Sequence, residues 1–502
     1  MSPLLLLLLG LLLVCVLRGR KRRAGEPPLI KGWIPFIGKV LEFGKDPYAF
    51  LEQQRKKFGD VFTVHIAGKY MTFIMDPFMY PSIVKNARQL DFHKFSNQMA
   101  PIVFGYPSVM NFPGLHEEVL RTFKLLQGND LTNLTESMMG NLMLLFRQDH
   151  LGEWPKGQGA WKTSGLYEFC KLVMFEATFL TIYGRAAPAG RHRKMDELRE
   201  DFVKFDSMFP LLVTKFPIRL LRRTKASRDK ILHFIMPHRV SCWSNTSRFI
   251  RKRAEMLDHH DTLRDIDKAG HHFAMLWASV ANTVPASFWV LYYLLSHPEA
   301  LEVVRREIRD VLNLSGFWFS TDKEMKLSRE QLDKLRYMES SIKESLRLSS
   351  ASMNIRVVEE DFNMQLDSDH SAAVRKGDII VLYPQSLHMD PSIYEEPQTF
   401  RFDRYIQDGR EKTDFYKDGK KLKYYYMPFG SGSTKCPGRH LAVNEIKEFL
   451  CVLLTYFELE LEEGQTRVTV DTGRVGLGVL LPASDIRFRY RLRIYQPEQM
   501  CQ

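Results

Sequence analysis

Cys436 lies in a glycine-rich stretch, with Gly430 and Gly432 before it and Gly438 after it. These glycines allow a tight turn in which backbone N–H groups face the sulfur. An apolar helical pattern follows over 441–457, so the positive end of a helix dipole lies near the same sulfur. Both features stabilise a thiolate, the form of cysteine that binds a metal. An isolated cysteine before a helix is more often a buried structural residue, but this spacing favours a metal ligand.

Phe429, Gly432, Cys436 and Gly438 have the spacing Phe-x-x-Gly-x-x-x-Cys-x-Gly. This motif resembles the haem-binding loop of the cytochrome P-450 family. The resemblance implies that Cys436 is the axial thiolate ligand of haem b and that the other three residues shape its loop. It also implies a monooxygenase that uses O2 and electrons from NADPH, delivered by a separate NADPH-cytochrome P-450 reductase. The chain itself shows no Gly-rich dinucleotide or flavin motif.

The haem propionates that the resemblance implies need cationic partners. Many family members place a basic residue two positions before the cysteine, where this chain has Thr434. The resemblance points to Arg356 as one propionate partner. Arg121 and Lys124 lie at helical spacing and are further candidates, although a solvent-exposed helix face is the commoner explanation of such a pair.

The segment 273–295 contains no charged residue. Its hydropathy is typical of a membrane span, but polar residues and Pro285 interrupt it, so we interpret it as a buried central helix with a break. Pro285 has no N–H to bond the carbonyl of Ala281, which predicts a kink that leaves this carbonyl free. Asn282 and Thr283 stand beside it and can hold water.

The resemblance identifies this segment with the long helix that crosses the haem face, where water delivers protons to bound oxygen. Ala281 and Asn282 stand where most family members have an acid followed by threonine. Ala281, Asn282, Thr283 and Pro285 are therefore the predicted catalytic positions. The departure from the usual acid and threonine resembles a branch of the family that acts on steroids and prostanoids.

Glu344 and Arg347 lie three residues apart, on one face of a helix. Alone, such a pair is usually a surface contact. The resemblance joins both residues to Arg404 in a buried charge network, in which one arginine binds the carboxylate through two hydrogen bonds and the other completes a planar group. The predicted role of this network is structural, because it locks the helix to the loop that carries Cys436.

The resemblance alone places a substrate cavity in this chain. Its expected segments are largely apolar and suit a large apolar ligand oriented by a few polar groups; they are Met99–Tyr106, Phe205–Leu211, Leu276–Asn282, Ser350–Ile355 and Val475–Leu480. The predicted substrate contacts within them are Trp277, Val280, Ala281, Asn282, Ser350, Ser352, Asn354 and Leu477. Each of these residues, taken singly, is more often ordinary packing or solvation.

The resemblance implies a mainly α fold with small β-sheets, of the α+β class. Alternation with a period of two over 60–74, around Gly68, predicts a β-hairpin in one of these sheets. An almost unbroken run of Leu and Val from Pro3 to Leu17 precedes a basic cluster at 18–23. This order is the reverse of a cleavable signal, so we predict an uncleaved N-terminal membrane anchor helix.

Three segments follow from this interpretation. Residues 1–24 are the predicted transmembrane anchor with its basic stop, 25–38 a proline-rich hinge, and 39–502 the catalytic domain. The basic cluster places the catalytic domain on the cytoplasmic side. With the resemblance, this predicts a single-pass protein of the endoplasmic reticulum membrane that contacts membrane lipid.

The net charge of +12 favours anionic partners. No nucleic-acid motif is found, and basic residues around Cys436, including Lys435 and Arg439, instead suggest a docking face for an acidic redox protein. The six cysteines are scattered, with no pair at metal-ligand spacing. This argues against a zinc site and against a disulfide framework.

Four segments resemble the sterol 7α-hydroxylase branch, and the similarity extends over nearly the whole chain; they are Gly25–Trp33, Trp277–Pro285, Lys343–Ser350 and Leu422–Ser431. The N-terminal third is most similar to the enzymes that act on oxysterols, whereas Ser350–Arg356 is nearer to those that act on cholesterol. We therefore expect 7α-hydroxylation of an oxysterol such as 25- or 27-hydroxycholesterol. Alternatives are cholesterol 7α-hydroxylation, sterol 12α-hydroxylation, an isomerase like prostacyclin synthase, and a non-catalytic haem- or sterol-binding protein.

Overall fold

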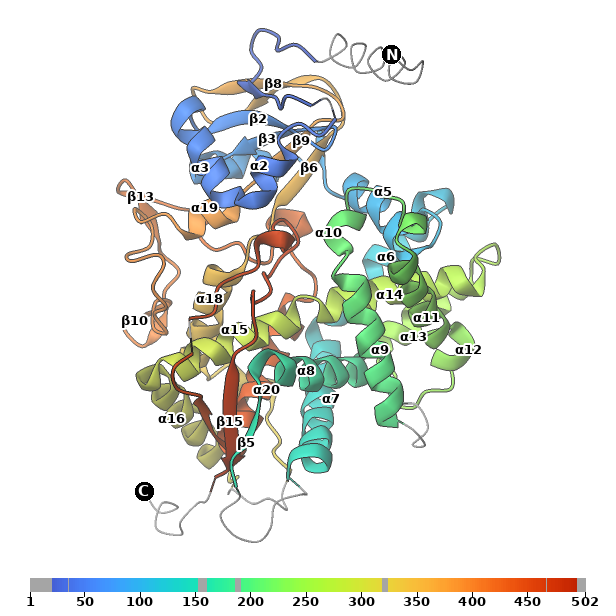
Figure 1. Ribbon diagram of the computed structural model, residues 1–502, viewed down its shortest axis with the longest axis vertical. Helices are drawn as coiled ribbons and strands as arrows, with labels where there is room; N and C mark the ends of the chain where they lie inside the picture. Colours follow the sequence, from blue (N-terminus) through green and yellow to red (C-terminus); the bar gives the residue numbers. More distant parts are fainter. Residues whose placement is uncertain are drawn as a thin grey trace, which may run out of the picture.

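The computed structural model describes residues 20–34, 36–151, 160–185, 191–317, 324–465 and 467–493. A six-stranded sheet and its short helices form a lobe at the top of Figure 1, and long helices form the larger body below it. The predicted class, mainly α with small β-sheets, is confirmed. The predicted anchor run, 3–17, lies outside the described residues.

The described residues contain α-helices from α2 to α20. They are α2 (Val40–Lys45), α3 (Pro47–Phe58), α4 (Tyr80–Lys85), α5 (His93–Phe104), α6 (Leu115–Thr122), α7 (Gly128–Phe146), α8 (Leu166–Tyr183), α9 (Arg191–Asp206), α10 (Phe209–Leu212), α11 (Arg222–Phe234), α12 (Pro237–Val240), α13 (Arg248–Asp258), α14 (Asp265–Val280), α15 (Thr283–Ser296), α16 (Pro298–Leu314), α17 (Arg329–Leu332), α18 (Arg336–Ser349), α19 (Pro384–His388) and α20 (Arg439–Tyr456). Short helical turns are η1 (Pro77–Met79), η2 (Val109–Asn111), η3 (Phe123–Leu126), η4 (Arg147–Leu151), η5 (Ile218–Leu220), η6 (Gly432–Thr434) and η7 (Thr472–Arg474).

The strands form one larger sheet and several small ones. They are β1 (Leu29–Ile30), β2 (Val61–Ile66), β3 (Lys69–Ile74), β4 (Leu90–Asp91), β5 (Lys162–Gly165), β6 (Asn354–Val358), β7 (Phe362–Gln365), β8 (Ser371–Val374), β9 (Ile379–Leu382), β10 (Ile406–Gln407), β11 (Arg410–Glu411), β12 (Tyr416–Lys417), β13 (Lys420–Lys421), β14 (Phe457–Leu461) and β15 (Arg487–Leu492). The larger sheet has the order β1-β2-β3-β9-β6-β4, and a second sheet has the order β14-β15-β5.

The predicted hairpin is present as β2 and β3, which pair antiparallel from Val61 opposite Ile74 to Ile66 opposite Lys69. Ala67 and Gly68 form its turn with positive φ angles, a conformation that glycine adopts without strain. β9 extends the sheet beside β3 in a parallel pairing. The sheet therefore brings the N-terminal hairpin beside a strand more than three hundred residues later, and β6 follows on the other side of β9.

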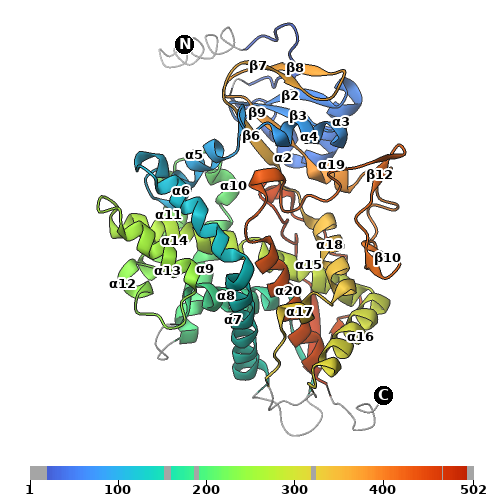
Figure 2. The same ribbon diagram turned by 180° about the vertical axis from the view of Figure 1, so that it is seen from behind.

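The predicted central helix is two helices, α14 and α15, which cross the middle of the body in Figure 1. Among the described residues, this 32-residue stretch from Asp265 to Ser296 is apolar enough to cross a membrane, but 72% of its most apolar window is buried in the protein. It is therefore the core helix of a folded body. α20 packs against α7 and α15, as Figure 2 shows from the opposite side.

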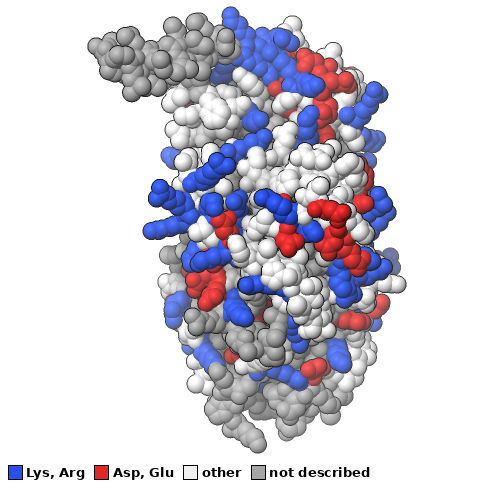
Figure 3. Space-filling view, turned by 90° about the vertical axis from the view of Figure 1, so that its right-hand side faces the viewer, with Lys and Arg blue, Asp and Glu red and all other residues white. Residues whose placement is uncertain are grey.

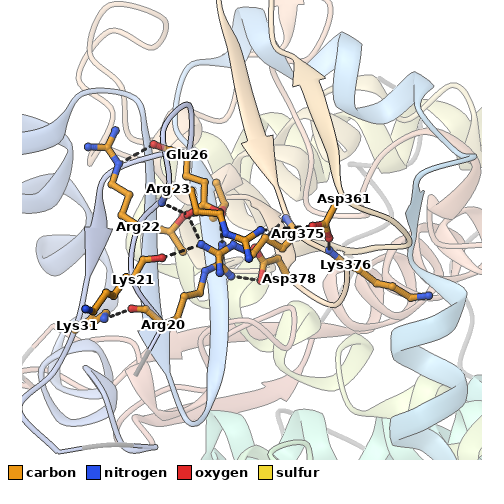
Figure 4. Close-up of polar contacts among 12 residues, drawn as sticks. Arg20, Lys21, Arg22, Arg23, Glu26, Lys31, Asp361, Arg375, Lys376 and Asp378 are labelled. Atoms are coloured by element: carbon orange, nitrogen blue, oxygen red, sulfur yellow. Dashed lines mark hydrogen bonds and ion pairs between the residues drawn. The ribbon is translucent and has the colours of Figure 1, made fainter. Parts of the chain in front are cut away.

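The chain from Arg20 onward is fixed to the sheet lobe, as Figure 4 shows. Glu26 is 5% exposed and binds Arg375 through both carboxylate oxygens, and Arg20 pairs with Asp378. Burial raises the pKa of Glu26, but hydrogen bonds from Arg375 and from the Arg23 N–H outweigh it and hold that pKa at about 2. β1, within the segment that the sequence assigns to a hinge, pairs in parallel with β2. The domain boundaries themselves stay a prediction.

Candidate active site

The cysteine loop runs between the sheet lobe and the N-terminus of α20. The N–H of Cys436 donates to the carbonyl of Phe429 at 2.8 Å, which closes the loop. Gly430 and Gly432 have φ angles of +78° and +60°, and a Cβ on Gly432 would lie 2.5 Å from Val84 Cγ1. These two positions therefore require glycine. Gly438 has an ordinary φ of −87° and is instead the N-cap of α20.

The Cys436 side chain is exposed, yet it lies deep enough in the protein that burial raises the pKa of its thiol. Both properties fit a side chain that faces an internal space. Backbone N–H groups of Gly438 and Arg439 lower the same pKa, together with the charge of Arg439. α20 begins at Arg439, two residues before the predicted start, so its positive end is directed at the sulfur. The arrangement suits a thiolate that is stabilised by a bound metal.

Arg356 lies beside this loop and is 5% exposed. Its Nη2 donates to Thr434 Oγ1 at 2.6 Å, so the threonine that replaces the usual basic residue holds a guanidinium from β6. Burial lowers the pKa of Arg356, and no described carboxylate forms an ion pair with it. A buried cation without an anionic partner is costly. This position therefore fits an anionic group such as a propionate.

The structure places the other predicted propionate partner differently. Arg121 is exposed in the last turn of α6. Its neighbour Thr122 is buried and accepts a hydrogen bond from Arg253 Nη1 at 2.8 Å. A role for Arg121 at the propionates stays a prediction.

The three residues of the predicted charge network come together as expected. Arg347 binds the Glu344 carboxylate through Nε and Nη2, both at 2.8 Å, and Arg404 Nε contacts Glu344 Oε1 at 2.8 Å. Glu344 and Arg347 are fully buried and Arg404 is 8% exposed. Both guanidinium groups also lie over the ring of Tyr394, at 5.0 and 6.0 Å from its centroid. The network joins α18 to the loop after α19.

His388 connects this network to the cysteine loop, a role that was not predicted from the sequence. Its carbonyl accepts from Arg347 Nη1 at 2.6 Å, and its ring Nε2 accepts from the N–H of Met427 at 3.0 Å. Met427 opens the loop that ends at Cys436. His388 is fully buried, and burial together with the charge of Arg347 lowers its pKa to about 3. The ring is therefore neutral and acts as an acceptor.

Replacing His388 by leucine is expected to lower the free energy of unfolding by about 1–3 kcal/mol, because the buried N–H of Met427 loses its acceptor. Glutamine at this position keeps a side-chain acceptor and is expected to restore part of the loss. Urea unfolding measures the stability, and the haem content of the purified variants reports on the loop. A leucine variant that matches the parent in both measurements would remove His388 from this role.

The central helix breaks at Ala281 and Asn282, between α14 and α15. Asn282 has a φ of −109°, and Pro285 is the third residue of α15, where an N–H would have no partner within the helix. The break predicted from Pro285 is therefore present and lies a few residues before the proline. Thr283 Oγ1 donates to the carbonyl of Ser279 at 2.8 Å.

Asn282 binds the loop 476–480. Its Oδ1 accepts from the N–H of Val479 at 3.0 Å, and a Cβ on Gly478 would lie 2.3 Å from the same oxygen. Gly478 and its neighbours also bond the 350–354 segment, through Ala351 N–H to the carbonyl of Gly478 at 2.9 Å. Three predicted substrate segments therefore meet at this asparagine.

Replacing Asn282 by alanine is expected to cost about 1–3 kcal/mol, because the N–H of Val479 is left without an acceptor. The 476–480 loop should then loosen relative to α15. Hydrogen exchange of peptides from this loop checks the prediction, with Asn313→Ala, at an exposed position on α16, as the matched control. Unchanged exchange in Asn282→Ala would contradict it.

The other predicted substrate residues differ in their burial and in their polar contacts. Val280 and Ala281 are 1% and 4% exposed and pack in the core, whereas Trp277 and Leu477 are half-buried. The hydroxyls of Ser350 and Ser352 and the Asn354 Nδ2 are buried without a partner among the described residues; Asn354 Oδ1 accepts from Ser431 Oγ at 3.2 Å. Asn354 therefore also ties β6 to the cysteine loop.

One face of α14 is partly open near its C-terminal end. Ala278 is exposed, and Met275, Ser279 and Asn282, which share its face by helical spacing, are partly exposed. The sequence analysis missed Ala278, although its position four residues before Asn282 was the available signal.

The side chain of Trp277 is fixed by two contacts. Its Nε1 donates to Asp206 Oδ1 at 2.8 Å, and its ring stacks on Phe209 with centroids 3.9 Å apart. Asp206 also pairs with the buried Arg474 of η7. No pattern in the sequence indicates that residues so far apart are in contact, so neither the Trp277–Asp206 bond nor the Asp206–Arg474 pair was predicted.

The residues around Cys436 fit a thiolate-bound haem. The cysteine would supply an axial ligand and Arg356 a cation for a propionate, and Gly430 and Gly432 permit the close loop. When bound, such a haem activates O2 and inserts one oxygen atom into a C–H bond. The protein's own part is to position the sulfur, to place Asn282 and Thr283 at the helix break, and to close the site with the 476–480 loop.

Comparison with known proteins agrees with this geometry. The sequence model of the family described as "Cytochrome P450" matches residues 27–489. "Cytochrome P450 7B1" of Mus musculus is 42% identical over 503 residues, which cover 99% of this chain and 98% of the relative. "Cholesterol 7-alpha-monooxygenase" of Cricetulus griseus is 42% identical, with 94% and 95% covered. "25-hydroxycholesterol 7-alpha-hydroxylase" of Rattus norvegicus is 40% identical, with 83% and 99% covered.

The match extends over almost the whole chain and includes the cysteine loop, the charge network and the broken central helix. The chain belongs to the cytochrome P450 family, whose enzymes bind haem through a cysteine thiolate and use O2 with electrons from a reductase.

Proposed function

We propose that this chain is a sterol 7α-hydroxylase that acts on an oxysterol such as 25- or 27-hydroxycholesterol, in bile acid and steroid metabolism. The observation that carries the proposal is identity of 40–42% to relatives whose names specify 7-alpha hydroxylation of cholesterol or 25-hydroxycholesterol. The geometry supports it, since the segments 276–282, 350–354 and 476–480 meet through Asn282 and Ala351, and Asn354 bonds Ser431 of the cysteine loop. Their few unpartnered polar groups can orient a large apolar ligand.

Cholesterol is the second candidate substrate, because the relative named for cholesterol is as similar as the one named cytochrome P450 7B1. A turnover panel separates the candidates. The holoenzyme is given reductase, NADPH and one of three sterols: 25-hydroxycholesterol, cholesterol or a 7α-hydroxylated sterol. We expect a 7α-hydroxylated product, with the highest kcat/KM for 25-hydroxycholesterol.

The other outcomes of the panel have distinct meanings. Oxidation at carbon 12 of the 7α-hydroxylated sterol would instead assign a 12α-hydroxylase. In a separate assay with an endoperoxide and no reductase, conversion of the endoperoxide would assign an isomerase like prostacyclin synthase. Haem or sterol binding with no product from any substrate would assign a binding protein, and each of these results would overturn the proposal.

The electron donor in this proposal is NADPH-cytochrome P-450 reductase, which docks on the face around the cysteine loop. Exposed basic side chains support this docking; they are Lys420, Lys421, Lys423, Lys435 and His440. Charge pairs across such an interface raise association rates and weaken with salt. We expect Lys435→Glu to lower the rate of the first electron transfer and to reduce its salt dependence. Equal stopped-flow traces for parent and variant would contradict this docking face.

We also propose that the chain is a single-pass protein of the endoplasmic reticulum membrane with its catalytic domain in the cytoplasm. Three glycosylation sequons begin at Asn133, Asn245 and Asn313, and all three asparagines are exposed. They would be accessible to glycosylation in the lumen. We expect no change in electrophoretic mobility after endoglycosidase treatment of the protein from mammalian cells. A mobility shift would reverse the proposed orientation.

A further inference from the structure

A groove of about 790 Å³ lies between the N-terminal strand β1 and the helices α2 and α3. It is on the sheet lobe, away from the central helices α14 and α15 (Figure 1). Ile30, Phe50 and Phe58 form apolar parts of its lining. Ile30 and Phe50 are 8% exposed, so the apolar floor is largely packed into the lobe.

Four lysines and two carboxylates line the same groove; they are Lys31, Lys39, Lys45, Lys57, Glu42 and Asp46. Both carboxylates are already engaged. Glu42 pairs with Lys39 at 2.6 Å, and Asp46 accepts from the N–H of Ala49 at 2.9 Å as the N-cap of α3. Neither Lys45 nor Lys57 forms an ion pair with a described residue. The groove therefore presents two unpaired ammonium groups above an apolar floor, which suits an anion with an apolar part.

An exposed apolar surface adjoins the groove. Its residues come from the chain just before α2 and from α2 itself; they are Trp33 at 98%, Leu41 at 75%, Phe36 at 70%, Ile34 at 45% and Ile37 at 37% exposed. Contiguous exposed apolar residues of this kind mark interaction sites. A tryptophan beside lysines is typical of the interface between a membrane and water. A lipid surface would cover this patch and bring its head groups to the lysines.

The attachment of the chain near Arg20 adds a third observation. Lys31, at the rim of the groove, donates to the carbonyl of Arg20, and Arg20 is held by Asp378 (Figure 4). The groove is therefore fixed next to the point where the predicted anchor joins the lobe. Lys and Arg also gather at the upper end of the molecule in Figure 3, the end that carries this sheet.

We propose that the groove between α2 and α3 binds the head group of an acidic phospholipid, with Lys45 and Lys57 contacting its anionic oxygens, while the exposed apolar side chains enter the bilayer; they are Trp33, Ile34, Phe36, Ile37 and Leu41. Each ammonium group near an acidic lipid surface strengthens binding about fivefold. The bound lipid would hold the sheet lobe against the membrane in one orientation. This inference rests on the proposed membrane location and is independent of the proposed sterol chemistry.

Hydrogen exchange of the full-length holoenzyme in lipid nanodiscs tests the proposal. One set of discs contains phosphatidylcholine alone, and the others contain increasing fractions of phosphatidylserine. We expect phosphatidylserine to slow amide exchange in peptides from α2 and α3. Lys57→Glu, which removes a positive charge and adds a negative one, should require more than about fivefold more of it for the same protection. Lys45→Glu should behave in the same way.

Lys56→Glu is the matched control, because Lys56 is exposed on α3 next to Lys57 but does not line the groove. It makes the same change of charge on the same helix. A specific site predicts that Lys56→Glu keeps the parent's response, whereas diffuse attraction predicts equal losses for Lys56→Glu and Lys57→Glu. Equal losses, or no effect of phosphatidylserine on the parent, would overturn the proposal.

A second arm distinguishes the source of the anion. Inorganic phosphate is added to discs of phosphatidylcholine alone, and protection equal to that from phosphatidylserine would assign a free-anion site and overturn the lipid assignment. Flotation of the chain with phosphatidylcholine vesicles reports separately on its membrane location. Sterol turnover by each variant shows whether the holoenzyme is intact, so failure of the groove proposal is distinguishable from failure of the proposed function.

Discussion

Glu344→Gln is expected to lower the free energy of unfolding by about 3–5 kcal/mol and to yield protein with little haem. Glutamine is nearly the same size as glutamate, so packing is kept and only the negative charge is lost. Arg347 and Arg404, which are 0% and 8% exposed, would then share a buried site without a counter-charge. Because Arg347 also bonds the carbonyl of His388, the disturbance reaches the start of the cysteine loop.

Glu460→Gln is the matched control for this change. Glu460 pairs with Arg489 on the surface strands β14 and β15, where both side chains are about half exposed. Loss of such a pair costs less than about 1 kcal/mol. Urea unfolding and haem content, measured for both variants, decide the question. A Glu344→Gln protein with normal haem content and unchanged stability would show that the buried network does not support the loop.

The cysteine loop and the charge network were predictable from the sequence because each depends on residues at fixed, short spacings. Glycine is required at 430 and 432 by their positive φ angles, and Glu344 and Arg347 share a helix face whatever surrounds them. The position of Arg404 beside them came from the family resemblance. The structure adds the physical reason, which is a shared carboxylate and the ring of Tyr394.

The contacts that could not be predicted from the sequence join distant segments, each through one hydrogen bond or ion pair. Asn282 bonds Val479, and Asp206 pairs with Arg474, 268 residues away. No local pattern of hydrophobicity or charge encodes such a pairing. Thr434 illustrates the same limit, since its departure from the family motif was visible but its partner, Arg356, became apparent only in three dimensions.

The position of the helix break also depended on tertiary structure. The missing N–H of Pro285 predicted a kink and a free carbonyl at Ala281, whereas the structure interrupts the helix at Ala281 and Asn282. Asn282 leaves regular helical geometry where its side chain binds the N–H of Val479. The proline then occupies the first turn of α15, a position that it tolerates without loss of a hydrogen bond.

Cys436→Ser is expected to abolish sterol turnover while leaving the free energy of unfolding within about 1 kcal/mol of the parent's in the absence of haem. The N–H groups of Gly438 and Arg439 lower the pKa of the Cys436 thiol against the effect of burial, so iron can displace its proton. A serine hydroxyl is a far weaker acid and stays protonated under the same influences. The variant therefore lacks an anionic axial ligand.

The difference spectrum of the reduced carbon monoxide complex measures this ligation directly. Cys242→Ser is the matched control, because Cys242 is exposed and its thiol donates to the backbone carbonyl of His238. We expect the control to keep the thiolate spectrum and full turnover, whereas Cys436→Ser should lose both. A Cys436→Ser protein with the parent's spectrum, or a parent whose carbon monoxide complex absorbs like that of a histidine-ligated globin, would show that another residue holds the iron.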